Sequence, residues 1–135
     1  MIVVDVNALV YLWVPGEHAD SARKLLERDA DWRAPLLWRS EFRNVLVLFM
    51  RRGLITLEKA TQVMAAADAQ MRDSECEVDS MSVLKLAATT SCSAYDCEYV
   101  ALAQRLGAPL VTSDRQVLAA FPAVAVHLDK FAPRT

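Results

Sequence analysis

Short apolar runs alternate with longer amphipathic segments along the chain. Residues 2–4 read IVV, a β-branched run that is typical of a strand buried on both faces of a sheet. Similar short runs predict four further strands, at 34–37, 75–79, 109–112 and 124–128. Apolar residues at helical spacing, together with start and stop signals, predict helices at 18–30, 38–52, 56–72, 80–90, 94–106 and 114–121.

The order of these elements indicates the fold class. Strands that alternate with helices predict an α/β protein, a three-layer α/β/α sandwich whose mostly parallel sheet is connected by right-handed crossovers. The length of 135 residues falls in the range of one domain, and no internal repeat or shift of composition marks a boundary. We therefore expect a single domain over residues 1–135.

Composition restricts the classes of function. The net charge of −2 argues against a uniformly basic nucleic-acid-binding surface, although it leaves room for a local basic patch. The hydrophobic fraction of 54% suggests a sheet covered on both faces or a partner interface. Three cysteines without paired spacing favour reduced thiols, so we expect a cytoplasmic protein. The N-terminal segment lacks a basic region and breaks at Pro15 and Gly16, so we expect no signal peptide and no membrane span.

Four acidic residues lie where the predicted strands end or the following helices begin. Asp5 and Asp114 follow predicted strands, and Glu41 and Asp96 fall in the first turns of predicted helices. Each has an ordinary structural explanation as a helix cap or as a charge that complements a helix dipole. Ser93 and Asp96, for example, fit a capping box.

The four acids taken together suggest a metal site. Ligands of parallel α/β sheets bind outside the carboxyl ends of the strands, where this topology would gather all four carboxylates. Like charges cannot all stay ionised close together unless a cation compensates them. An all-oxygen ligand set suits Mg²⁺ or Mn²⁺. His18 and His127 lie outside the acidic positions, which counts against zinc, and we interpret both as surface or packing residues.

Four stretches of the chain carry a resemblance to a known family. They are VVDVNALVYLW, WRSEFRNVL, SAYDCEYVALAQRLGAPLVTSD and the terminal hydrophobic strand. In order and spacing they resemble PIN-domain proteins, specifically the VapC-type toxins of prokaryotic toxin–antitoxin pairs. The resemblance implies an α/β/α sandwich, acids that hold Mg²⁺ or Mn²⁺, and cleavage of single-stranded RNA. The catalytic acids of the family fall on Asp5, Glu41, Asp96 and Asp114.

The resemblance also implies roles for individual residues. Asp5 and Asp96 would be principal metal ligands, and Asp114 a ligand acting directly or through water. Glu41 would orient the attacking water or bind a second metal ion. Many relatives carry a Thr-Ser pair after the first acid, where this chain has Val and Asn7, and some carry a further acid after the fourth, which this chain lacks. Asn7 can still bond a carboxylate or a metal-bound water.

Other polar and aromatic residues have two interpretations each. Thr112 matches a hydroxyl position of the family and would orient Asp114, although a threonine before a helix is often a cap. Arg39 and Arg43 flank Glu41 and are candidates for RNA-phosphate contacts. The aromatic residues at 11 and 13 would stack bases or receive a partner helix, and we favour partner contact.

The sequence therefore supports three functions. The first is a metal-dependent endoribonuclease, the toxin of a type II pair, which cuts a tRNA or another structured RNA, forms a homodimer and is inhibited by a VapB-type antitoxin. The second is a catalytically inert PIN-like interaction module, against which the retention of all four acids counts. The third is an aspartyl-phosphate or receiver-type domain with Asp5 as nucleophile, which requires a lysine near the acids. No lysine occupies an obvious strand-end position among Lys24, Lys59, Lys85 and Lys130.

Overall fold

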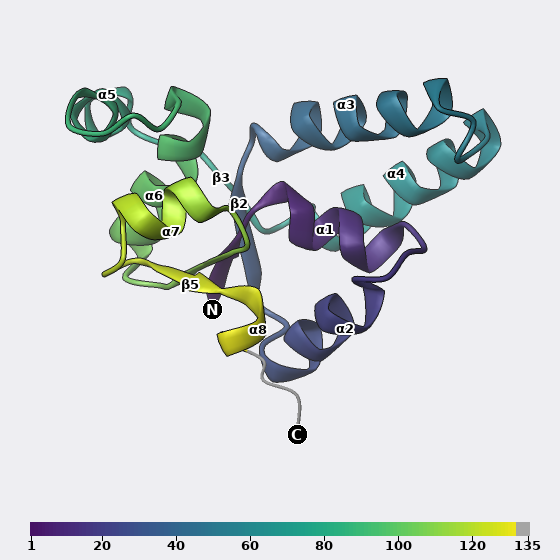
Figure 1. Ribbon diagram of the computed structural model, residues 1–135, viewed down its shortest axis with the longest axis horizontal. Coiled ribbons are helices and arrows are strands. Elements are labelled where there is room, and N and C mark those ends of the chain that lie inside the picture. Colours follow the sequence, from purple (N-terminus) through teal and green to yellow (C-terminus); the bar gives the residue numbers. More distant parts are fainter. Residues whose placement is uncertain (132–135) are drawn as a thin grey trace.

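The computed structural model describes residues 1–131, so residues 132–135 of the expected single domain lie outside it. In the described chain, five parallel strands form one sheet in the order β3-β2-β1-β4-β5 (Figure 1). The strands are β1 (Ile2–Val4), β2 (Trp32–Pro35), β3 (Glu75–Cys76), β4 (Leu110–Thr112) and β5 (Ala125–His127). All three residues of central strand β1 are buried, which explains its unbroken apolar run.

Helices cover both faces of this sheet. One layer consists of α1 (Val6–Trp13), α2 (Ala19–Arg28), α3 (Trp38–Arg51) and α4 (Leu57–Met71). The other layer consists of α5 (Ser80–Ala88), α6 (Ala94–Leu106) and α7 (Arg115–Ala120). Figure 1 shows the two layers on opposite sides of the strands, and α6 contacts β1, β2 and β4. The three-layer α/β/α sandwich expected from the sequence is therefore confirmed.

The strand order creates a switch point between β1 and β4. From β1 the chain proceeds to β2 and then to β3, and it crosses back to β4 on the other side of β1 before reaching β5. Connections leave β1 and β4 in opposite directions, which opens a crevice outside their carboxyl ends. Asp5 directly follows β1 and Asp114 begins α7 after β4, so the fold positions both acids at this crevice.

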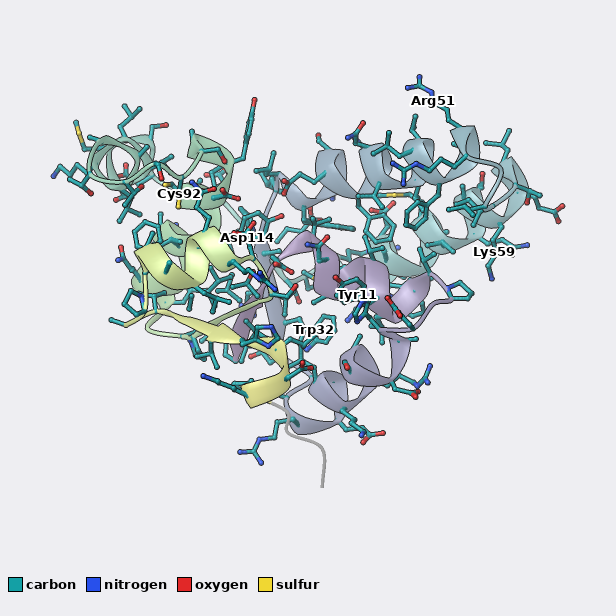
Figure 2. The ribbon with its side chains drawn as sticks, in the orientation of Figure 1. Tyr11, Trp32, Arg51, Lys59, Cys92 and Asp114 are labelled. Atoms are coloured by element: carbon teal, nitrogen blue, oxygen red, sulfur yellow. The ribbon has the colours of Figure 1, made fainter. Side chains whose placement is uncertain are left out.

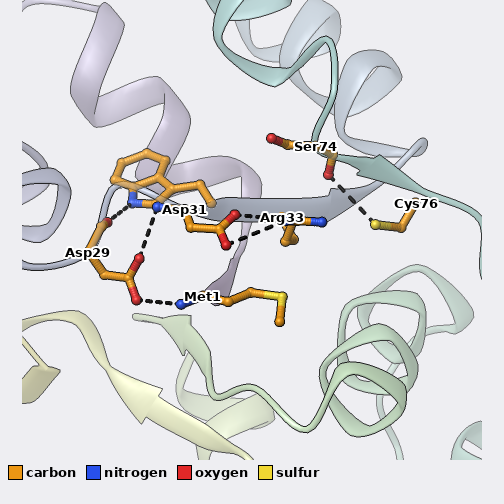
Figure 3. Close-up of polar contacts among 7 residues, drawn as sticks. Met1, Asp29, Asp31, Arg33, Ser74 and Cys76 are labelled. Carbon is orange, nitrogen blue, oxygen red and sulfur yellow. Dashed lines mark hydrogen bonds and ion pairs between the residues drawn. The ribbon is translucent and has the colours of Figure 1, made fainter.

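The amino-terminal ends of the strands are held by a separate polar cluster (Figure 3). The terminal amino group of Met1 forms an ion pair of 2.7 Å with Asp29, and Asp29 also accepts the backbone N–H of Asp31 at 2.9 Å. Asp31 pairs in turn with Arg33 of β2 at 2.7 Å. The Trp32 indole donates to the carbonyl of Asp29 at 2.8 Å. These contacts link the start of β1 to the segment that enters β2.

Several predicted boundaries differ from the structure. Strand β2 begins and ends two residues earlier than expected, because Trp32 is buried in the core whereas Leu36 is 49% exposed in the turn before α3. Strand β3 is only two residues long, and the chain then turns so that Asp79 caps α5. The short helix α8 (Leu128–Phe131) was not predicted.

Helix ends agree better with the sequence signals. The Thr56 hydroxyl accepts the N–H of Lys59 at 3.0 Å, as expected for the cap of α4. Gly53 after α3 has φ 72° and Gly107 after α6 has φ 62°, a left-handed conformation that glycine adopts without strain. Within residues 1–131, no helix is both long and apolar enough to cross a membrane.

Candidate active site

All four predicted acids line one pocket at the carboxyl ends of β1 and β4. The pocket has a volume of about 160 Å³ and is lined by residues of both helical layers. Figure 2 labels Asp114 at the start of α7. Residues from both layers and from the sheet line the pocket, namely Asp5, Val6, Asn7, Glu41, Asp96, Tyr99, Leu110, Thr112, Asp114 and Val117. The fold therefore brings Asn7 and Thr112 together with the four acids around one pocket.

Asp5 is fixed by hydrogen bonds to both carboxylate oxygens. As the N-cap of α1, it accepts the backbone N–H of Ala8 on Oδ1 at 3.1 Å, and Oδ2 accepts the hydroxyl of Thr112 at 2.5 Å. Burial raises the pKa of Asp5, and the nearby charge of Asp114 adds to that rise, while the hydrogen bonds from Thr112 and Ala8 oppose it. Ionising Asp5 in the folded protein therefore costs free energy.

Thr112 connects the two strand-end acids in an unexpected way. We expected it to orient Asp114, but its hydroxyl donates to the carboxylate of Asp5 and accepts only the backbone N–H of Asp114, at 3.0 Å. The side chain of Asp114 instead caps α7, where Oδ1 accepts the N–H of Val117 at 3.0 Å. Both strand-end acids thus cap a helix and line the pocket at the same time.

Glu41 reaches the pocket from the first turn of α3. Its Oε1 accepts the hydroxyl of Tyr99 at 2.6 Å. Burial raises the pKa of Glu41, and the charges of Asp96 and Asp5 raise it further. Tyr99 was not among the site residues predicted from the sequence. Its position three residues after Asp96 indicated that the two side chains share one face of the helix. No pattern in the sequence indicated that the hydroxyl of Tyr99 would bond Glu41 of α3.

Asp96 lies half-buried in the first turn of α6 and lines the pocket. The Ser93 hydroxyl accepts the N–H of Asp96 at 3.0 Å, as a capping box requires. Over residues 1–131, however, no hydrogen bond returns from the N–H of Ser93 to the carboxylate of Asp96. The capping box is only half formed, so capping does not account for the carboxylate of Asp96.

At about 100° of rotation per helical residue, the sequence predicts that Glu98 points about 160° away from Asp96, on the outer face of α6. In the structure that face is not open. Glu98 is half-buried and lines a separate pocket with Val78, Val83 and Leu84, because α5 packs over this side of α6. Burial raises the pKa of Glu98. A substitution at Glu98 would therefore alter stability, which makes this residue a poor control for the acids of the pocket.

The two candidate arginines do not line the acidic pocket. Arg39 forms an ion pair with Glu75 at the start of β3, and Glu75 also accepts the indole N–H of Trp38 at 3.2 Å. Arg43 lines an apolar groove between α3 and α4, together with residues such as Met64. Contact of Arg39 or Arg43 with RNA phosphate therefore remains a prediction for a surface beside the pocket.

The aromatic residues of α1 pack within the protein. The Tyr11 ring lies 4.6 Å from the imidazole of His18, measured between centroids, and the Trp13 indole donates to Gln70 of α4 at 2.7 Å. Both aromatic side chains are half-buried against the core. His127 accepts the N–H of Asp129 at 3.1 Å, so both histidines have the packing or surface roles that we expected.

The chemistry of the pocket fits a hard divalent cation. Its acidic side chains are all carboxylates, an oxygen-only set that suits Mg²⁺ or Mn²⁺, and burial, with smaller contributions from neighbouring carboxylates, raises the pKa values of Asp5 and Glu41. As the side chains stand, no three Asp, Glu, His or Cys residues in the described chain are grouped closely enough to hold a metal ion. Hydrogen bonds from Thr112 and Tyr99 hold two of the acids, so metal binding would require the carboxylates to converge.

Comparisons with known proteins agree with this architecture. A family model described as PIN domain matches residues 2–124, and the chain belongs to the PIN domain family. The chain is 32% identical to Ribonuclease VapC3 of Pyrobaculum aerophilum over 127 residues. This alignment covers 91% of this chain and 96% of that protein.

Solved structures show the same fold. PAE2754 from Pyrobaculum aerophilum has a TM-score of 0.76 at 25% identity, with 98% of this chain and 97% of that chain covered. FitAcB from Neisseria gonorrhoeae has a TM-score of 0.71 at 15% identity, with coverages of 95% and 98%. A toxin-antitoxin complex from Klebsiella pneumoniae has a TM-score of 0.65 at 16% identity, also with coverages of 95% and 98%. The similarities to FitAcB and to the Klebsiella pneumoniae complex, at 15% and 16% identity, show a shared fold only.

Proposed function

We propose that this protein is a metal-dependent endoribonuclease and the toxin of a type II toxin–antitoxin pair, acting in the cytoplasm. The observation that carries this proposal is the convergence of Asp5, Glu41, Asp96 and Asp114 on one pocket in a PIN-domain chain. The similarity to a ribonuclease over nearly the whole chain supports RNA as the substrate. We propose a tRNA or another structured RNA with exposed single-stranded loops.

The acids of the pocket would hold Mg²⁺ or Mn²⁺. A divalent cation held there makes a water nucleophilic at neutral pH and neutralises charge that develops on the phosphate. Asp5 is suited to a fixed ligand position toward which the other carboxylates would move, because hydrogen bonds from Thr112 and from the start of α1 hold its carboxylate. Asp96 forms no hydrogen bond through its carboxylate in the described structure, so both of its oxygens are free to bind.

Glu41 is suited to act on water. One of its oxygens is engaged by Tyr99, which leaves the other to accept a hydrogen bond from a water molecule or to bind a cation. Asp114 also lines the pocket and is the exposed member of the four acids. We assign Asn7, which also lines the pocket and is exposed, to a supporting polar contact with a carboxylate or with water.

Cleavage assays test the proposal directly. Purified protein free of any partner is incubated with a pool of cellular RNAs in Mg²⁺, in Mn²⁺ and in EDTA, and the products are separated by gel. We expect cleavage with either metal and none in EDTA. Asp5→Asn should be inactive, whereas Glu58→Gln, an exposed acid in the first turn of α4, should cut normally. Equal cleavage in EDTA would show that the metal assignment is wrong.

We also propose an antitoxin partner and a homodimer. Structures of similar fold include a toxin-antitoxin complex, and large apolar residues are exposed near the turn between α3 and α4. Leu48 is 40% exposed, Leu54 64% and Leu57 72%. We place the antitoxin segment over the acidic pocket and near residues 9–13, of which Leu9 and Val10 are buried, so that only the half-buried side chains of residues 11–13 are open to contact. Sedimentation velocity at micromolar concentration, with and without the antitoxin, tests this assembly, and a monomer in both experiments would contradict it.

The two alternative functions have less support. An inert interaction module has no need to gather four acids in one pocket. A receiver-type domain requires a lysine beside its acids, and no lysine lines this pocket in the described chain. Activity of the metal-loaded protein on RNA would exclude the inert module.

A further inference from the structure

Tyr99 lines the acidic pocket but is not one of the four acids that would hold the cation. Its side chain is only 5% exposed, and the neighbouring Val100 and Leu102 are fully buried, so the ring belongs to the core. Because Tyr99 follows Asp96 by three residues on α6, the two side chains share one face of the helix. The core thus holds a phenol hydroxyl at the wall of the pocket.

The partner of that hydroxyl lies in the opposite helical layer. Tyr99 donates to Oε1 of Glu41 at 2.6 Å, a contact between residues 58 positions apart in the sequence. Glu41 comes from α3 on one face of the sheet and Tyr99 from α6 on the other, so this hydrogen bond spans the carboxyl edge of the sheet (Figure 1). A hydrogen bond to an ionised carboxylate is short and stronger than one between neutral groups.

We propose that Tyr99 is a positioning residue, which holds Oε1 of Glu41 so that the carboxylate keeps one orientation with Oε2 left for water or a cation. A glutamate side chain has three rotatable bonds and moves freely unless something fixes it. The ring of Tyr99 is immobilised by the core and therefore provides a rigid anchor for a flexible acid. This inference rests on the proposed nuclease function and deepens it.

A purely structural role makes a different prediction. Buried tyrosines generally need a hydrogen-bond partner for the hydroxyl, and losing that bond lowers stability whatever the partner does in catalysis. If Tyr99 acts by positioning Glu41, removing its hydroxyl should change the cleavage rate only while residue 41 carries a carboxylate. A double-variant comparison of Tyr99 and Glu41 separates these two roles.

The experiment uses Tyr99→Phe, Glu41→Gln and the double variant. RNA cleavage is measured at saturating Mn²⁺, and Mn²⁺ affinity is measured independently by electron paramagnetic resonance of the free ion. We expect Tyr99→Phe to slow cleavage about tenfold or more, as for loss of a hydrogen bond to a charged group. It should also change Mn²⁺ affinity in the same direction as Glu41→Gln does. In the Glu41→Gln background, both effects should shrink to less than about twofold.

Matched controls make the result decisive. Tyr95→Phe changes another tyrosine of α6, which is 61% exposed, and should resemble the wild type. Glu41→Asp is a second test, because the shorter side chain withdraws the carboxylate from the hydroxyl of Tyr99. It should lose activity, and adding Tyr99→Phe should then cost little more. This second pair of variants still decides the question if Tyr99→Phe alone melts at a lower temperature.

The outcomes also distinguish this inference from the function on which it rests. If Asp5→Asn cuts RNA as well as the wild type, the proposed active site is wrong. If Asp5→Asn is inactive but Tyr99→Phe is fully active, only the role of Tyr99 is overturned. The role of Tyr99 is also overturned if Tyr99→Phe lowers the cleavage rate by the same factor with Glu and with Gln at position 41.

Discussion

The hydroxyl of Thr112, at the end of β4, donates to Oδ2 of Asp5, just beyond the end of β1, at 2.5 Å. Thr112 is only 2% exposed and also accepts the backbone N–H of Asp114 at 3.0 Å. This single side chain therefore links the two acids that follow the central strands. Because burial raises the pKa of Asp5, the hydroxyl supplies part of the stabilisation of the ionised carboxylate that water would otherwise provide.

Removing this hydroxyl should destabilise the protein. Thr112→Val keeps the shape of the side chain but leaves Oδ2 of Asp5 without a donor and the N–H of Asp114 without an acceptor. We expect the free energy of unfolding to fall by about 1–3 kcal/mol near pH 7, the usual cost of a buried polar group left unpaired. Urea denaturation measures the change. Thr112→Ser keeps the hydroxyl and should lose markedly less, so equal losses in the two variants would contradict this account.

The stability of the metal-free protein should depend on pH through Asp5 and Glu41. Both pKa values are raised in the folded state above their ordinary values of 3.8 and 4.5, so the folded protein binds these protons more tightly than the unfolded chain does. Their contribution to stability is therefore present below the ordinary values and is lost as pH rises through the raised ones. The pKa of Asp29 is lowered in the folded state. Its contribution to stability is therefore present above its ordinary pKa and is lost as pH falls through the lowered value.

Urea denaturation in EDTA between pH 4 and pH 8 tests this dependence. The contribution of the pocket acids should make the wild type less stable toward pH 8. Asp5→Asn removes one of the two acids, and the slope of stability against pH should become shallower for this variant. An identical slope in the wild type and in Asp5→Asn would show that Asp5 has the same pKa in both states.

Mg²⁺ or Mn²⁺ should stabilise the folded protein. A ligand that binds only the folded state raises stability by RT ln(1 + [L]/Kd), about 2.7 kcal/mol when its concentration is 100 times Kd. The melting temperature should therefore rise with added Mn²⁺ and return to its starting value after chelation. Asp5→Asn should show little of this shift, whereas Glu58→Gln should retain it. A shift of equal size in both variants would place the binding site elsewhere.

Asp96→Asn distinguishes chemistry from capping. The carboxylate of Asp96 bonds no backbone amide in the described structure, so replacing it should change the free energy of unfolding by less than about 1 kcal/mol. Relief of its repulsion with Glu41 should even favour the metal-free protein. Cleavage should nevertheless fall about a hundredfold or more, since each 1.36 kcal/mol of lost transition-state stabilisation costs a factor of ten.

Two controls accompany this variant. Ser93→Ala removes the cap that is actually formed and should lower stability by about 1 kcal/mol while leaving the cleavage rate per folded molecule unchanged. Glu58→Gln should alter neither quantity. If Asp96→Asn and Ser93→Ala behave alike in both measurements, Asp96 serves only the start of its helix.

The sequence by itself determined the fold class and placed the four acids at one edge of the sheet. Buried parallel strands require apolar runs such as residues 2–4, and parallel topology places residues that follow the strands, such as Asp5 and Asp114, at the same edge. Helical periodicity placed Asp96 on the inward face of α6. These inferences need only local periodicity and the rules of strand connection.

Only the tertiary structure decided which side chains contact one another. The bond from Thr112 to Asp5 joins residues 107 positions apart, and the bond from Tyr99 to Glu41 crosses between helical layers. Such pairs depend on the order of the strands and on the side chain orientations that packing allows, which no local pattern encodes. The same reason explains Glu98, whose outward angle on α6 was correct but whose surroundings were set by α5 packing over that side.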